Sequence, residues 1–108
     1  MKKEILAECC ELFCVHPRDL VGPTRYAFLL PARFAIYKAL TERGWSHSKT
    51  AELMNRDRST ISHGIDRAEY RMARDAQYAR KVQRLIEFVP DYMKPTPAEE
   101  PLDDQRDK

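Results

Sequence analysis

Glycine is scarce in this chain, and long apolar runs and strand-like alternation are missing from it. Only three of the 108 residues are glycine, and no Val, Ile and Thr run alternates with polar residues. No apolar segment approaches the roughly 18 residues of a membrane span. Glu4, Glu8 and Glu11 interrupt the apolar residues near the N-terminus, where a signal peptide is continuous. We therefore predict an all-α protein, located in the cytoplasm and associated with no membrane.

The few cysteines do not form a disulfide framework. Cys9, Cys10 and Cys14 fall within six residues, and an odd number so closely spaced is a poor basis for cross-links. Cys10 and Cys14 lie one helical turn apart, and His16 follows, which is one way to begin a metal site. A second group of ligands is missing. We interpret the cysteines as reduced thiols that act as small hydrophobes on a helix, and we predict no metal.

No glycine-rich phosphate loop with its lysine occurs in the sequence, which argues against ATP binding and hydrolysis. The cysteines and histidines offer a nucleophile and a base, but no spacing groups them into a catalytic set. We therefore predict neither catalytic residues nor a cofactor.

Charge is unevenly distributed along the chain. The net charge is +2, but residues 17–74 hold eleven Lys and Arg against six Asp and Glu, whereas residues 90–108 hold three against six. A basic body followed by an acidic tail favours a polyanionic partner.

Apolar residues recur at spacings of three and four, which predicts a compact bundle of about five helices. Pro17 should end the first helix, because its ring cannot continue the hydrogen-bond ladder, and the following stretch DLVGPTRYAFLL should be a loop or an irregular turn. Residues 1–89 would form one domain, and 90–108 a disordered tail rich in proline and acids. The expected helices cover residues 3–14, 31–43, 48–54, 58–74 and 76–89.

Candidate capping residues lie between the later helices. Ser46 and Ser48 are alternative N-caps for the third helix. Asn55 tolerates the left-handed conformation that a sharp turn needs. Asp57 should cap the fourth helix with its side chain, and Asp75 the last one. Whether the chain bends at Asp75 or continues straight is open.

The stretch RDRSTISH at residues 56–63 joins a short helix, a tight turn and the start of a second helix, as in a helix-turn-helix. Ala51 is small enough for close helix packing, and Ile61 and Ile65 should point to the core. Arg58, Ser59, Ser62 and His63 would then face outward, with Thr60 near the edge.

These side chains suit contact with DNA. In a helix-turn-helix the front of the second helix enters the major groove. Arg58 can donate two hydrogen bonds to guanine, and Ser and Thr hydroxyls can bond base edges or phosphates. The alternative is an ordinary surface helix with hydroxyl residues at its cap.

Three blocks resemble the C-terminal DNA-binding domain of the bacterial replication initiator DnaA, over residues 5–89. DLVGPTR resembles the family's Asp-Leu-x-x-x-x-Arg entry into a basic loop. PARFAIYKAL resembles the following Ala-Arg-x-x-Ala helix, and RDRSTISHG resembles the signature Arg-Asp-His-Thr-Thr-Val-x-His-Ala.

The resemblance implies roles for individual residues. Arg25 would enter the minor groove, and Arg33 would touch DNA from its helix. The signature residues would meet the major groove, and His63 would lie at the phosphate backbone or pack between helices. The complete predicted interface is Arg25, Arg33, Lys49, Arg56, Asp57, Arg58, Ser59, Thr60, Ser62 and His63.

This chain departs from the family pattern in four ways. Arg58 replaces a histidine, which predicts a different base preference. Phe34 replaces a polar residue, the turn is one residue shorter, and Arg25 is alone where the family often has several basic residues. The family's nucleotide-binding domain has no counterpart in these residues, so a stand-alone protein and an excised fragment are both open.

The leading hypothesis is sequence-specific binding of double-stranded DNA at initiator-type boxes or diverged relatives. The protein would regulate replication or transcription at the nucleoid, as a monomer or weak dimer, without ATPase activity. The alternative is a protein-interaction module that binds the full-length initiator or another partner.

Overall fold

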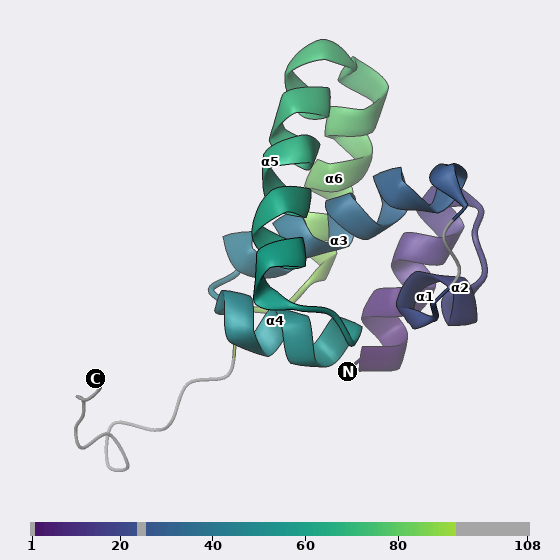
Figure 1. Ribbon diagram of the computed structural model, residues 1–108. Helices are drawn as coiled ribbons and strands as arrows, with labels where there is room; N and C mark the ends of the chain where they lie inside the picture. The colour runs from purple at the N-terminus through teal and green to yellow at the C-terminus, as the bar shows by residue number, and fades with distance from the viewer. Residues whose placement is uncertain (1, 24–25, 93–108) are drawn as a thin grey trace.

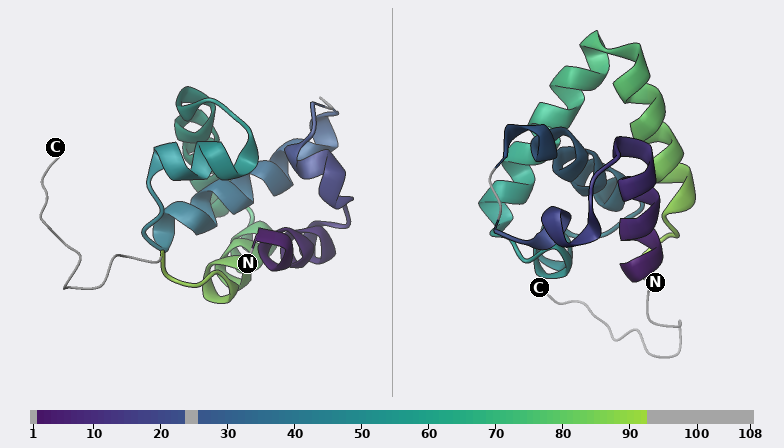
Figure 2. Two further views of the ribbon diagram at one scale, coloured as in Figure 1. Left: turned by 90° about the horizontal axis from the view of Figure 1, so that it is seen from below. Right: turned by 90° about the vertical axis from the view of Figure 1, so that its right-hand side faces the viewer.

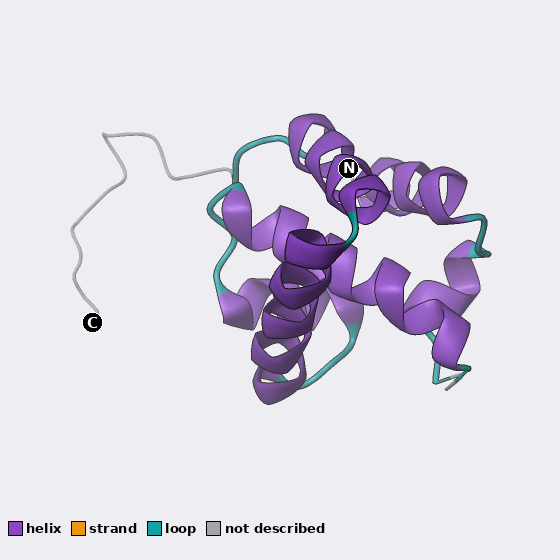
Figure 3. Cartoon of the chain, turned by 90° about the horizontal axis from the view of Figure 1, so that it is seen from above, coloured by secondary structure: helices purple, strands orange, loops and turns teal. Residues whose placement is uncertain are grey.

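The computed structural model describes residues 2–23 and 26–92. Within these ranges the chain forms six α-helices and one 3₁₀ turn, with no strand (Figures 1 and 3). The predicted all-α fold is confirmed. The helices are α1 (Lys2–Phe13), α2 (Pro17–Val21), α3 (Leu30–Glu42), α4 (His47–Met54), α5 (Arg58–Arg74) and α6 (Ala76–Phe88), with the 3₁₀ turn η1 at Ala27–Leu29.

Helix α3 is the centre of the fold, because α1, α4, α5 and α6 all pack against it. Figure 2 shows it enclosed between the N-terminal helices and the α5–α6 pair. Its alanines Ala32, Ala35 and Ala39 are fully buried together with Ile36 and Leu40. Small side chains allow neighbouring helices to approach closely, and the larger ones fill the remaining space.

Helix α1 covers α3 and α6 with the apolar stripe that the sequence predicts. Ile5, Leu6, Cys9 and Cys10 are buried, and all three cysteines are free thiols. Cys14 is exposed and follows the end of α1 with a positive φ of 58°. The interpretation of the cysteines as small helical hydrophobes therefore holds for Cys9 and Cys10, but not for Cys14.

Residues 17–21 form a helix that the sequence did not predict. Pro17 ends α1, as expected, but it also occupies the first turn of α2, where its missing N–H is not needed. His16 caps this helix by accepting a hydrogen bond from the amide of Arg18 at 3.2 Å. The predicted loop or irregular turn is wrong over residues 19–21, because His16 and Pro17 together begin a helix that includes them.

The chain bends sharply at Asp75, so that α5 and α6 form an antiparallel hairpin (Figure 1). The Oδ1 of Asp75 accepts hydrogen bonds from the amides of Gln77 at 3.0 Å and Tyr78 at 3.1 Å. The predicted cap is confirmed. The hydroxyl of Tyr78 donates to the carbonyl of Pro31 at 2.7 Å and ties the hairpin to α3.

Gly64 allows α5 to lie directly on α3. A Cβ at this position would stand 2.5 Å from Cδ2 of Tyr37 and 2.9 Å from Cδ1 of Phe34. Only a residue without a side chain fits this approach, so Gly64 fixes how closely the second helix of the predicted helix-turn-helix lies to the core.

The N-cap residues of α4 and α5 differ in whether their side chains make a capping hydrogen bond. Ser46 accepts from the amide of Lys49 at 3.0 Å, and Asn55 is left-handed at φ 58°, ψ 51°, as predicted. Asp57 occupies the N-cap position of α5, but its side chain makes no capping bond. That prediction is wrong; the carboxylate is exposed, and solvent can satisfy the first amides of α5 instead.

The packed body continues a little beyond α6. Val89 is fully buried, the amide of Tyr92 donates to the carbonyl of Arg43 at 2.9 Å, and the Tyr92 ring lies 5.0 Å from that of Trp45. The predicted disorder of the tail concerns mostly 93–108, which lie outside the described residues. None of the described helices has the length and apolarity needed to cross a bilayer.

The two aspartates at consecutive helix starts give a matched test of the cap geometry. Asp75→Ala should lower the free energy of unfolding by about 1 kcal/mol, because two amides lose their acceptor. Asp57→Ala should change it by less than about 0.5 kcal/mol, since no capping bond is lost. Urea unfolding followed by circular dichroism measures both, and equal losses would mean that Asp57 does cap α5.

Candidate nucleic-acid interface

Helices α4 and α5 form the predicted helix-turn-helix. Ala51 and Met54 of α4 are buried, as is Ile61 in the first turns of α5, while Ile65 is partly buried against the same core. The turn between the helices runs through the left-handed Asn55. This arrangement buries the apolar side of α5 and leaves the front of the helix exposed.

The exposed front of α5 carries Arg58, Ser59, Ser62 and His63, and Thr60 is half-buried beside them. Within the described residues, Arg58, Ser59 and Ser62 make no side-chain hydrogen bond or ion pair, so their donors are free for a ligand. His63 alone is engaged, weakly, since its Nε2 accepts from Nε of Arg67 at 3.4 Å.

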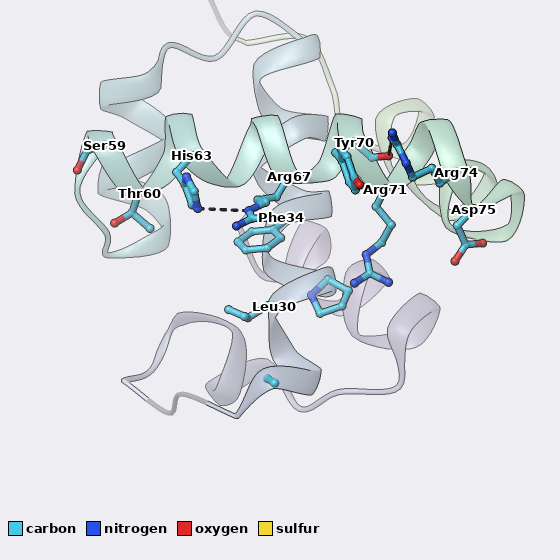
Figure 4. A pocket seen from close by; sticks show the side chains of 12 residues that line it. Leu30, Phe34, Ser59, Thr60, His63, Arg67, Tyr70, Arg71, Arg74 and Asp75 are labelled. Atoms are coloured by element: carbon cyan, nitrogen blue, oxygen red, sulfur yellow. Dashed lines mark hydrogen bonds between the residues drawn. The ribbon is translucent and has the colours of Figure 1, made fainter.

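A groove runs between α5 and the segment that leads into α3 (Figure 4). The α5 wall begins with Ser59, Thr60 and His63, whose side chains follow one another along the helix in the figure. The facing wall is apolar and includes Leu30 and Phe34. One wall can therefore donate hydrogen bonds and hold positive charge, while the other can only make van der Waals contact.

The same groove extends to basic residues that sequence reasoning missed. Arg67, Tyr70, Arg71 and Arg74 continue the α5 wall, and Arg74 lies over the Tyr70 ring, with its Cζ 3.7 Å from the ring centroid. The signal was present: these positions continue from His63 at spacings of three and four, so they share its helix face. The predicted interface ended at His63 and therefore omitted these arginines.

Arg33 occupies a different place from the one predicted. Its side chain is only 5% exposed. Nε donates to the carbonyl of Leu20 at 3.2 Å, and Nη2 donates to the carbonyls of Asp19 and Gly22. Arg33 thus satisfies carbonyls at the end of α2 that have no helical partner. Contact of Arg33 with DNA stays an untested prediction, which this buried position does not favour.

Arg56 reaches the same carbonyls from the turn before α5. Its Nη1 donates to Val21 at 3.1 Å, and its Nη2 donates to Gly22 at 2.7 Å. Nη1 also donates to the carbonyl of Asn55 at 3.0 Å, within the turn itself. We call Arg33 and Arg56, with the carbonyls of residues 19–22, the arginine clamp. It joins the end of α2 to both α3 and the start of α5.

The clamp brings two positive charges together in a partly buried place. Burial lowers the pKa of Arg33 below its ordinary value, and the nearby charge of Arg56 lowers it further. An arginine remains protonated despite such shifts, because its ordinary pKa exceeds about 12. Several carbonyl dipoles offset the repulsion between the two guanidinium groups, and the nearby charge of Asp19 acts in the same direction on Arg33.

Comparison with known proteins shows that part of this chain is similar in sequence to a replication initiator. The chain is 35% identical over 75 residues to the chromosomal replication initiator protein DnaA of Thermomicrobium roseum. Part of this chain is therefore related in sequence to DnaA. The match covers 68% of the chain but only 16% of that DnaA, so the chain spans a small part of its relative's length. No protein-family model matches the chain.

The remaining residues of the predicted DnaA-like interface are exposed or outside the described ranges. Lys49 is exposed on α4, with its Nζ 3.7 Å from the carboxylate of Glu52. Asp57 is exposed beside Arg58 at the start of α5. Arg25 lies outside the described residues, so its predicted minor-groove contact stays a prediction.

Replacing Arg33 with Met tests the role that the clamp gives it. Arg33→Met should lower the free energy of unfolding by about 1–3 kcal/mol, because the carbonyl of Asp19 loses its bond from Arg33 and those of Leu20 and Gly22 keep only Arg56. Arg67→Met removes an equal charge from an exposed position and should cost less than about 0.5 kcal/mol. Chemical unfolding of both variants measures this difference, and an unchanged stability of Arg33→Met would remove Arg33 from the clamp.

Proposed function

We propose that this protein binds double-stranded DNA in a sequence-specific manner, with the front of α5 in the major groove. One observation carries the proposal: α5 begins with Arg58, Ser59 and Ser62 exposed and unpaired among the described residues, while its opposite side is buried on α3 and α4. A polar helix front without internal partners is what major-groove readout needs.

The dimensions of the fold are compatible with this docking. The major groove of B-DNA is about 12 Å wide and admits an α-helix. Helix α5 spans 17 residues, so only its first turns need to enter the groove. The first turn of α5 contains no acidic residue, and the exposed amides there favour a phosphate.

We assign different tasks to the residues along α5. Arg58 reads a guanine through O6 and N7, and the exposed carboxylate of Asp57 can accept from the amino group of a cytosine. Ser59 and Ser62 complete the contacts with base edges. Thr60, His63 and Arg67 line the groove beside this front and would hold the phosphate backbone of the strand that passes there.

The relationship to DnaA supports this proposal and narrows it. The relative is by name a chromosomal replication initiator, and the shared segment covers 68% of this chain. We propose that the sites bound are initiator-type boxes or diverged relatives of them. The protein would then regulate replication or transcription at the nucleoid, where it would compete with the full-length initiator.

Arg58 provides the most specific test of base reading. The preferred site would first be selected from random duplex DNA and then scanned base by base. Arg58→Ala should relax the preference at one position, a guanine, by about 5- to 150-fold, because a bidentate pair discriminates by roughly 1–3 kcal/mol. Arg58→His should move the preference toward that of the family, whose signature has histidine there.

Two control variants separate base reading from general electrostatic attraction to DNA. Lys49→Ala should weaken all sequences by the same factor, because an exposed lysine on α4 would meet only phosphate. Arg84→Ala, on the exposed side of α6, should change nothing. Identical base preferences of wild type and Arg58→Ala would exclude Arg58 as a reader and leave Ser59 and Ser62 as the candidates.

A further inference from the structure

Three exposed apolar side chains gather in the short segment that leads into α3. Tyr26 and Phe28 are each 64% exposed and Leu30 is 39% exposed. The rings of Tyr26 and Phe28 stack at a centroid distance of 5.5 Å and an interplanar angle of 13°. We call these three residues the aromatic ridge. Large exposed apolar groups in a cluster mark a binding surface.

The backbone holds the ridge outward. Leu29, between Phe28 and Leu30, is fully buried, and its amide donates to the carbonyl of Tyr26 at 3.0 Å. Phe28 and Leu30 flank this buried anchor and point elsewhere, because side chains in a 3₁₀ turn recur every three residues. The turn therefore accounts for the exposure of Phe28, and Tyr26, in extended backbone just before the turn, stacks its ring on that of Phe28.

The ridge adjoins the proposed DNA interface. Leu30 of the ridge and its neighbour Ala27 line the groove together with Thr60 and His63. Figure 4 shows Leu30 on the wall opposite Thr60 and His63. A phosphate strand held by Thr60 and His63 would run between the two walls. On duplex DNA, the major groove lies on one side of a strand and the minor groove on the other. With the front of α5 in the major groove, the ridge would meet the minor groove across that strand.

The charge around the ridge favours a polyanion as its partner. Residues 20–41, which include the ridge, contain no Asp or Glu. Arg67 and Arg71 stand on the facing wall. A protein partner that recognised only apolar rings would not need this setting, but a nucleic acid requires it.

We propose that the aromatic ridge is a wedge that enters the minor groove, unstacks one base step and bends the duplex. This inference rests on the proposed function and deepens it. Apolar side chains that insert between base pairs unstack them partly and kink DNA by about 20–90°. The bend would bring more of the flanking phosphates to the α5 wall. Pyrimidine–purine steps are the easiest to kink, so the wedge would favour a site with such a step beside the box.

The test combines a bend measurement with a probe of base stacking. A duplex of the selected site carries a fluorophore pair at its ends and 2-aminopurine at the step beside the box. Wild-type protein should shorten the end-to-end distance and raise the 2-aminopurine fluorescence. Tyr26→Ala with Phe28→Ala should abolish both signals and weaken binding at least about fivefold. Because both rings are exposed, thermal unfolding should stay unchanged.

Phe88→Ala is the matched control, because Phe88 is also exposed, at 43%, but lies at the end of α6 away from the groove lining. It should bend DNA as wild type does. The double variant removes no charge, so the salt dependence of its affinity should match that of wild type. Bending that persists in the double variant, or a wild-type complex with straight DNA, would overturn the wedge.

Other occupants of the ridge give other results. Loss of self-association in the double variant, with bending intact, would make the ridge a contact between copies of this chain and would overturn the wedge. Tighter binding of single-stranded than of duplex DNA through the rings would also overturn it. If the wild-type protein binds no duplex at all, the proposed function is wrong. If it binds duplex DNA without bending it, only the wedge is wrong, so the two failures are distinguishable.

Discussion

Arg33 and Arg56 donate hydrogen bonds to the carbonyls at the end of α2. These bonds hold α2, α3 and the start of α5 together beside the candidate interface. Arg33 comes from α3, and Arg56 comes from the turn before α5. Both donate to the carbonyls of Leu20 and Gly22. The end of α2 is therefore tied both to α3 and to the start of α5, the two helices that line the groove.

The clamp also explains how so small a protein holds one buried and one half-buried arginine side by side. A buried guanidinium is costly unless its donors are satisfied, and the ends of short helices leave carbonyls without partners. The guanidinium groups supply donors to the carbonyls, and the carbonyls supply acceptors to the guanidinium groups. Tyr37, fully buried below the clamp, and Gly64, which lets α5 reach the Tyr37 ring, complete the support from the core.

Local signals in the sequence were sufficient for the later helices. The start of α5 at Arg58, the left-handed Asn55 and the cap at Asp75 follow from residue type and position. The choice of Ser46 over Ser48 as the cap of α4 was left open by the sequence and is made by the structure. Contacts between distant residues were not predictable in this way. Arg33 lies 13 residues from Leu20, and Arg56 lies 34 from Gly22, and no spacing rule reports such pairs. Arg33 therefore resembled a DNA contact, although it is buried.

The missed α2 and the missed basic wall have separate physical causes. Pro17 both ends one helix and begins the next, and the sequence alone emphasised only the first effect. Arg67, Arg71 and Arg74 are ordinary surface arginines until the apolar wall around Leu30 and Phe34 stands opposite them. The groove is formed by two elements, α5 and the start of α3, so it is visible only once the fold brings them together.

Salt dependence of duplex binding tests the central claim, that the exposed front of α5 and its groove bind DNA, most directly. The affinity of the wild-type protein for its selected duplex would be measured from low to moderate salt. If about five phosphates are contacted, the logarithm of the association constant should fall with a slope of about −4 to −5 against the logarithm of salt concentration. A slope near zero, or no binding even at the lowest salt concentration, would contradict the claim.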